Sequence, residues 1–297
     1  MLTENKKRTH VGRIIKSTFS RFFRDDCSRL AAALSFYALF SIAPLLLIVV
    51  VIVGYIYGTE AIQGNIVNRL NELIGEKGAF LIQDMIISIS RPSSSILAST
   101  AGILLSLYGA SNVFNHLNIS INRIWKIILN PEAGLGYLLS RKFFLIILVI
   151  ATGLFFLFSL IISSTFNLFA GFLQEVIPAI SLIMEMFNSF FGLGITILAF
   201  VLIYKYIPDV KIAWEPLIIG SILSASLFSL SRLIISLYLR FSIYSSVYNA
   251  AASLIILLIW LYYCSQVLFL GAEFIYIYAN LCGKPVKPSS NARFSLS

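Results

Sequence analysis

The chain has 297 residues, of which 59% are hydrophobic and only 12% are charged, and its formal net charge is +9. Soluble domains contain about 45–50% apolar and about 25% charged residues, and a soluble fold of this size cannot hide so much apolar surface. The composition therefore excludes an ordinary soluble domain, an intrinsically disordered chain and, with three cysteines, a small disulfide-stabilised scaffold.

The first segment, residues 1–29, is strongly basic. Such a cluster beside a membrane span is typical of a cytoplasmic segment that lies against anionic lipid headgroups. We expect Asp25 or Asp26 to cap the first helix or to pair with Arg24 and Arg29. The basic residues that precede the first apolar run are Lys6, Lys7, Arg8, Arg13, Lys16, Arg21, Arg24 and Arg29.

Six apolar stretches are long enough to cross a membrane as helices, which requires about 20 mostly apolar residues each. The second and fifth stretches are more polar than the others. The pattern predicts an all-α fold, a polytopic helical bundle within residues 30–282. We place the spans at about 31–58, 94–116, 143–168, 186–206, 216–239 and 251–274.

The Lys and Arg residues alternate with these spans. If the N-terminus lies in the cytoplasm, 17 of them fall in cytoplasmic segments and 4 in outer segments, while Arg232 lies within a span. Cytoplasmic loops carry an excess of Lys and Arg. The distribution therefore predicts an even number of spans with both termini in the cytoplasm.

Two connections and the C-terminal tail have patterns of their own. Apolar residues at helical spacing between Glu60 and Arg91 predict an amphipathic helix at the outer surface. The same spacing runs from Phe114 to Ile128, so we expect the second helix to continue into the inner headgroup layer, with Trp125 at the interface. The Pro/Ser-rich residues 283–297 are expected to form a disordered cytoplasmic tail.

Polar side chains inside a bilayer are costly, and by default they mark function or helix packing. Small and polar residues share one face of the second span and one face of the fifth. These faces either pack closely against neighbouring helices or line a transport pathway. Arg232 either snorkels to the outer interface or offers its charge to an anion or lipid headgroup. The candidate residues are Asn112, His116, Ser221, Ser224 and Arg232.

Glu273 is the acidic residue of the sixth span, near its cytoplasmic end. A partly buried carboxylate at this depth predicts a structural ion pair that ties helix ends together. The candidate partners are Arg29, Arg123 and Lys205.

Catalytic and metal-binding motifs are missing from the sequence. There are two histidines, without HxH or HExxH spacing, and neither a GxSxG motif nor a P-loop. The three cysteines lack metal-ligand spacing, so we expect plain thiols. We therefore expect no enzymatic activity, no metal and no cofactor; an intramembrane enzyme would depend on His116 alone. The basic residues follow the membrane topology and do not form a groove with interleaved aromatics, so no nucleic-acid partner is expected.

Four segments resemble, in their order along the chain, the YihY/BrkB family of bacterial inner-membrane proteins. They are residues 29–54, 107–125 (LYGASNVFNHLNISINRIW), 204–214 (YKYIPDVKIAW) and 245–274. The resemblance covers about residues 12–282, although Asn249 and Ala252 stand where glycines are usual. It implies six spans in the bacterial cytoplasmic membrane and supplies no catalytic residues. Some members carry a ribonuclease BN label, which no ligand set in this sequence supports.

These observations lead to two expectations about function. The first is transport, or export of lipid or other envelope material. The alternative is a non-catalytic membrane scaffold or assembly factor for envelope proteins. The expected partners are membrane lipids, with anionic headgroups at the cytoplasmic face, and either further copies of the chain or envelope proteins.

Overall fold

A computed structural model describes residues 2–41, 111–130, 181–241 and 249–295, together with residues 136, 140, 141, 143, 144, 147, 148, 151, 154, 155, 158 and 162. The predicted outer amphipathic helix, and most of the first, second and third predicted spans, lie outside these residues. The described chain is mainly helical, as the apolar periodicity predicts.

Three described helices are long and apolar enough to cross a membrane: α6 (Ser181–Tyr206), α7 (Trp214–Phe241) and α8 (Asn249–Leu281). They coincide with the fourth, fifth and sixth predicted spans. The apolar windows within them are Ser189–Tyr206, Trp214–Leu233 and Leu257–Leu281, with 18, 20 and 25 residues.

Local signals explain where these helices begin and end. α6 stops two residues before Pro208, because a proline disfavours helical geometry in the residue that precedes it. α7 has Glu215 and Pro216 in its first turn, where an acidic side chain and a proline are both favourable. α8 ends at Leu281, shortly before Gly283, whose positive φ of 69° suits glycine, and Lys284 N donates back to Ala279 O at 3.0 Å.

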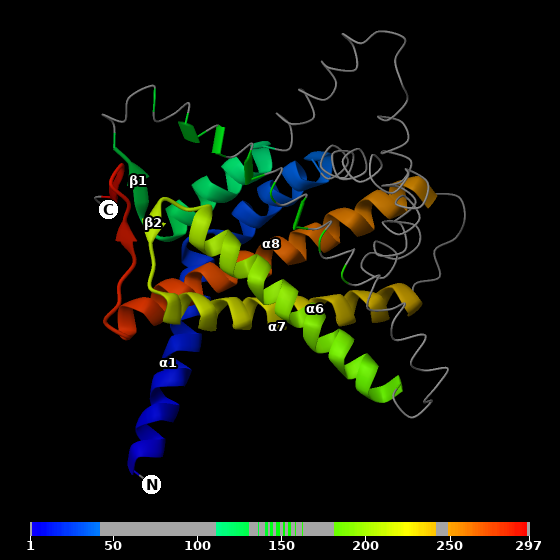
Figure 1. Cartoon of the computed structure of the whole chain (residues 1–297), viewed down its shortest axis with the longest axis horizontal. Helices are drawn as coiled ribbons and strands as arrows, with labels where there is room; N and C mark the ends of the chain where they lie inside the picture. Colours follow the sequence, from blue (N-terminus) through cyan, green and yellow to red (C-terminus); the bar gives the residue numbers. More distant parts are fainter. Residues whose placement is uncertain are drawn as a thin grey trace.

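The N-terminal part consists of two consecutive helices, α1 (Leu2–Arg24) and the short apolar helix Cys27–Ser41. The turn between them places Asp26 at a positive φ of 53°. Figure 1 shows α1 running across the direction of α7 and α8, with its N-terminus pointing away from the bundle. The second helix continues beside the helical residues 111–124 (Figure 1).

Four short strands lie together at one end of the bundle, which we call the strand end. β1 (Ile127–Leu129) pairs antiparallel with β4 (Ala292–Phe294), and β2 (Val210–Lys211) pairs antiparallel with β3 (Lys287–Pro288). α6 ends here, α7 begins here and α8 ends here (Figure 1).

The prediction that residues 283–297 form a disordered tail is therefore wrong for residues 283–295, which the structure describes. Val286 and Ala292 are only 2% and 8% exposed, and residues 287–294 contain β3 and β4, which pair with β2 and β1. The tail has too few apolar residues for a periodic signal. Its order comes from pairing with strands about 80 and 165 residues earlier in the chain.

The predicted continuation of the second helix to Ile128 is also wrong. The helix ends at residue 124, Lys126 adopts a positive φ of 58°, and the chain enters strand β1. The placement of Trp125 at an interface is wrong as well, since this side chain is fully buried. The burial of Trp125 and the pairing of residues 127–129 with β4 outweigh the helical spacing of the apolar residues here.

The described core is concentrated near the strand end. Several of its largest side chains have no exposed surface and come from different helices. They include Ile121, Trp125, Tyr204, Leu217 and Phe269.

Candidate functional site

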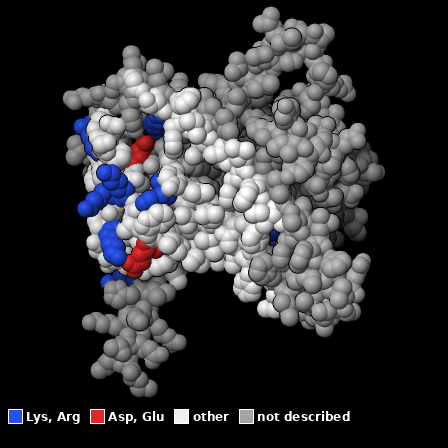
Figure 2. Space-filling model, viewed as in Figure 1, with Lys and Arg blue, Asp and Glu red and all other residues white. Residues whose placement is uncertain are grey.

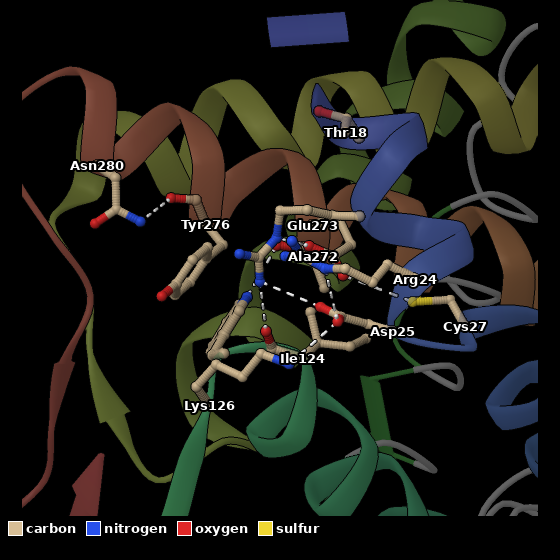
Figure 3. Close-up of polar contacts among 12 residues, drawn as sticks. Thr18, Arg24, Asp25, Cys27, Ile124, Lys126, Ala272, Glu273, Tyr276 and Asn280 are labelled. Carbon is tan, nitrogen blue, oxygen red and sulfur yellow. Dashed lines mark hydrogen bonds and ion pairs between the residues drawn. The ribbon is translucent and has the colours of Figure 1, made fainter. Parts of the chain in front are cut away.

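Two polar clusters and one close helix contact hold the strand end together. The first, which we call the Glu273 cluster, joins α1, α8 and the end of helix 111–124. Its residues are Arg21, Asp25, Cys27, Lys126 and Glu273 (Figure 3).

Glu273 lies on α8 with no exposed surface and is paired with α1. Arg21 Nε donates to Glu273 Oε2 at 2.8 Å. The same guanidinium donates through Nη2 to Asp25 Oδ2 at 3.3 Å and to the carbonyl of Ile124 at 3.1 Å, and lies 4.3 Å from the centre of the Tyr276 ring. One arginine therefore connects three separate segments. Removing one partner of a buried ion pair typically costs about 3–5 kcal/mol of folding free energy.

Asp25 completes the charge balance of the Glu273 cluster. Its Oδ1 accepts from Lys126 Nζ at 3.1 Å, while Cys27 Sγ lies 3.8 Å from the second oxygen of Glu273. Burial by itself raises the pKa of Asp25, but hydrogen bonds with Lys126 and Glu273 and the charges of Lys126 and Arg21 outweigh it and hold the pKa below its usual value. Burial likewise lowers the pKa of Arg21, and the pairing with Glu273 and Asp25 more than offsets this and raises it.

The backbone around the Glu273 cluster is fixed by a buried tryptophan. Trp125 Nε1 donates to the carbonyl of Ala272 at 2.9 Å, directly beside Glu273. The positive φ of Lys126 then directs the chain into β1 and leaves its side chain beside Asp25. Helix 111–124 is thus attached to α8 by an indole and to α1 by an ammonium group.

The second cluster, which we call the Asp209 cluster, joins helix 111–124 to the loop after α6. Asn122 Nδ2 donates to Asp209 Oδ2 at 2.7 Å, and Asp209 N donates back to Asn122 Oδ1 at 2.9 Å. Asn118 donates to the carbonyl of Ile207 and to Asp209 Oδ2, and Arg141 lies 3.2 Å from the same oxygen. The Asn118 and Asn122 amides are four residues apart, so they reach the loop from one helix face.

The close helix contact brings α6, α7 and α8 together. Tyr204 OH donates to the carbonyl of Leu268 at 2.8 Å and lies 2.9 Å from Ser224 Oγ. The single proton of the Ser224 hydroxyl is shared between the Tyr204 oxygen and the carbonyl of Gly220, each at 2.9 Å. Gly271 of α8 faces this pair so closely that an added Cβ would overlap both hydroxyl oxygens. A glycine is required at this position because the backbone of α8 approaches two polar side chains without space for a methyl group.

The structure gives Glu273 an ion pair, but with a partner different from those expected. Arg29 pairs with Asp26 at 3.0 Å, and Arg123 is exposed. Lys205 donates to the carbonyl of Ile212 at 2.9 Å and lies over the Trp214 ring. The pairing of Glu273 with Arg29, Arg123 or Lys205 is therefore wrong, because Arg21 already occupies the carboxylate. The pairing of Asp26 with Arg29, and of Asp25 with Arg24 at 3.6 Å, agrees with the sequence prediction.

The polar residues expected inside the bilayer occupy different environments. Ser221 and Ser224 are fully buried on α7; Ser224 is bonded to Tyr204, whereas Ser221 Oγ has no hydrogen-bond partner within the described part of the chain. His116 is half-buried, 3.3 Å from Ser120 Oγ and against the Tyr37 ring, and Asn112 is also half-buried. Arg232 is exposed on α7. Among the described residues, no contact brings these five together in one site.

Several residues of the clusters were not selected from the sequence: Arg21, Asn118, Asn122, Trp125, Tyr204 and Asp209. All but Arg21 lie within the two segments 107–125 and 204–214 that carry the family resemblance, and the amides show i, i+4 spacing. Arg21 is indistinguishable by pattern from the other basic residues of the N-terminal segment. Within the described residues, no group of three or more His, Cys, Asp or Glu side chains is placed to hold a metal ion.

Comparison with known proteins identifies the family. A family model described as virulence factor BrkB matches residues 18–293. A UPF0761 membrane protein of Acinetobacter baylyi is 27% identical over 262 residues, which is 86% of this chain and 59% of that protein. A second, from Pseudoalteromonas translucida, is 25% identical over 256 residues, which is 86% of this chain and 82% of that protein. No solved structure matches. The expected relationship is confirmed, and the chain is a membrane protein that belongs to the BrkB family.

Proposed function

We propose that this protein is a non-catalytic transporter of the bacterial inner membrane that moves a lipid-derived or other anionic envelope compound. The observation that carries the proposal is an asymmetric bundle, which is closed at the strand end and whose helices separate toward the opposite end. A cationic side chain, Arg232, is exposed on the α7 segment that leads away from the strand end.

The closure of the strand end rests on residues already described. The Glu273 cluster, the Asp209 cluster and the Tyr204–Ser224 contact connect every described helix there. Toward the opposite end, no polar contact of this kind joins α6, α7 and α8 among the described residues. Figure 1 shows α6, α7 and α8 diverging in that direction. An alternating-access protein closed on one side has this arrangement.

The proposal includes six spans with both termini in the cytoplasm. Figure 2 shows the described Lys and Arg side chains gathered at the strand end, with few elsewhere in this view. The positive-inside rule then supports a cytoplasmic strand end. The bacterial UPF0761 relatives support an inner-membrane location.

Arg232 is the residue on which the transport proposal is tested. The purified protein is reconstituted into liposomes that contain phosphatidylglycerol, and two fluxes are measured: translocation of a fluorescent anionic lipid and efflux of a small organic anion. Arg232→Ala is expected to abolish the active flux and Arg232→Lys to retain part of it. Ser226→Ala, also exposed on α7, is the matched control and should behave as wild type. Absence of both fluxes in the wild type, or equal flux in Arg232→Ala, would refute the proposal.

One observation favours the alternative of a scaffold or assembly factor for envelope proteins. Ser224, on the small and polar face of α7, lies in a close helix contact in the described residues rather than along an open path. A scaffold would co-purify with a stoichiometric envelope protein, and replacing residues 60–91 would release it. A stable partner together with no flux would favour this second function.

A further inference from the structure

α1 carries a surface that neither transport nor scaffolding explains. The helix has three distinct faces along residues 12–24. One is buried against α8 and includes Thr18 and Phe22, at 3% and 5% exposure. The second is apolar and exposed, and the third is basic and exposed.

The exposed apolar face consists of Ile15, Phe19 and Phe23, which are 50%, 49% and 68% exposed. Their spacing of four residues places them in one stripe along the helix. Arg13, Lys16 and Arg24 are exposed next to this stripe, on the side away from the buried face. At about 100° per residue the order around the helix is buried, apolar, basic.

This order of faces matches a helix that lies in a membrane interface. Such a helix inserts its apolar side about 5–10 Å into the boundary between headgroups and acyl chains, and its cations contact anionic headgroups. The direction of α1 agrees, since it runs across the spanning helices rather than parallel to them (Figure 1).

The depth at which α1 is attached also agrees. Arg21 holds α1 to Glu273, which lies eight residues before the end of α8 at Leu281. At about 1.5 Å per residue this is about 12 Å from the helix end. The apolar window of α8 has 25 residues, or about 37 Å, so it extends beyond a hydrocarbon core of about 30 Å. The attachment therefore lies near the boundary of the bilayer.

We propose that α1 is a surface helix that binds the anionic lipid bilayer, with Ile15, Phe19 and Phe23 among the acyl chains and Arg13, Lys16 and Arg24 among the headgroups. The Arg21–Glu273 ion pair fixes its position relative to α8. This surface is independent of the proposed transport, because none of its residues is Arg232 or part of the diverging ends of the helices.

The test measures the surroundings of α1 in the full-length protein in lipid nanodiscs. A nitroxide label is attached to a cysteine introduced at residue 15, 19 or 23, and in matched controls at 13, 16 or 20. The background carries Cys282→Ser and Cys264→Ala and retains the fully buried Cys27. Collision rates with oxygen, which concentrates in acyl chains, and with a water-soluble nickel complex are compared by electron paramagnetic resonance.

We expect oxygen to dominate at 15, 19 and 23 and nickel at 13, 16 and 20. The contrast should be greater in phosphatidylglycerol nanodiscs than in phosphatidylcholine nanodiscs. In a label-at-19 background, replacing Arg13, Lys16 and Arg24 with Gln should remove this dependence on lipid charge, because each cation near an anionic surface contributes about fivefold to binding.

Two outcomes would overturn the proposal. Nickel dominance at all six positions would place α1 in water. Exclusion of both probes at 15, 19 and 23, with immobilised spectra, would mean that another protein surface covers the stripe. Labels at three positions on each face keep the result interpretable if one variant does not fold, and gel filtration identifies such a variant.

Discussion

Gly271 provides the sharpest test of the packing at the strand end. Replacing it with alanine adds one methyl group to α8. An ideal Cβ at this position would overlap Ser224 Oγ and the Tyr204 hydroxyl oxygen and would lie 3.2 Å from Ser224 Cβ. The two hydroxyls cannot both stay in place, so the contact between α6, α7 and α8 has to widen or lose hydrogen bonds.

Three effects determine the magnitude. Forcing an extra methyl group into a packed interior costs about 1–3 kcal/mol. Losing the hydrogen bond between Tyr204 and Ser224 costs about 1 kcal/mol more. Alanine is favoured over glycine inside a helix by about 1 kcal/mol, which offsets part of the loss. We therefore expect Gly271→Ala to lower the free energy of unfolding by about 1–3 kcal/mol.

The assay is equilibrium unfolding of the purified protein in mixed micelles, followed by the loss of helical circular dichroism. Gly192→Ala is the matched control, because nothing lies within 4 Å of a Cβ added there, and it should be neutral or slightly stabilising. Adding Ser224→Gly to Gly271→Ala removes the nearest obstructing atom, so the double variant should lose less than the sum of the two single variants. If Gly271→Ala is as stable as Gly192→Ala, the described close contact is refuted.

Three further predictions concern the same end of the molecule. Trp125→Phe removes the hydrogen bond to Ala272 O and should cost about 1–3 kcal/mol of unfolding free energy in the same assay. The loss should be much larger than for the control Trp214→Phe, because Trp214 is 57% exposed. Equal losses would contradict a stabilising role for the Trp125 hydrogen bond. Deleting residues 285–297 removes β3, β4 and the buried Val286, so the melting temperature in detergent should fall. An unchanged melting temperature would mean that the pairing of these strands with β2 and β1 contributes nothing to stability. The pKa of Asp25 is below its usual value in the folded protein, so its ionised form stabilises the fold above about pH 3.9, and this contribution is lost as the pH falls through the lower folded pKa. Asp25→Asn should remove that acid-sensitive part of the stability. Identical acid unfolding profiles for the variant and the wild type would argue against this assignment.

Much of the fold is predictable from composition and order along the chain. The apolar runs of α6, α7 and α8 are visible because a helix in lipid must satisfy its backbone internally and present apolar side chains outward. The boundary at Pro208 follows from local backbone geometry. The clustering of cations at one end is the pattern that the positive-inside rule predicts for a membrane protein. Each of these signals depends only on residues close together in the sequence.

The partners of the buried polar groups could not be predicted from the sequence. Glu273 stands out as a costly charge in an apolar run, yet nothing near it in sequence identifies Arg21, which lies 252 residues earlier among other basic residues. The tail illustrates the same point, because its short strands form only against β1 and β2.

The sequence by itself determined that this is a membrane protein, where the long apolar helices α6, α7 and α8 lie, and its family. Only the tertiary structure decided which arginine neutralises Glu273, why Gly271 has no side chain, and that residues 287–294 are ordered. The physical reason is the range of the interactions. Hydrophobic periodicity and helix ends are set by neighbours within a few turns, whereas ion pairs, close helix contacts and strand pairing depend on which distant segments the folded bundle brings together.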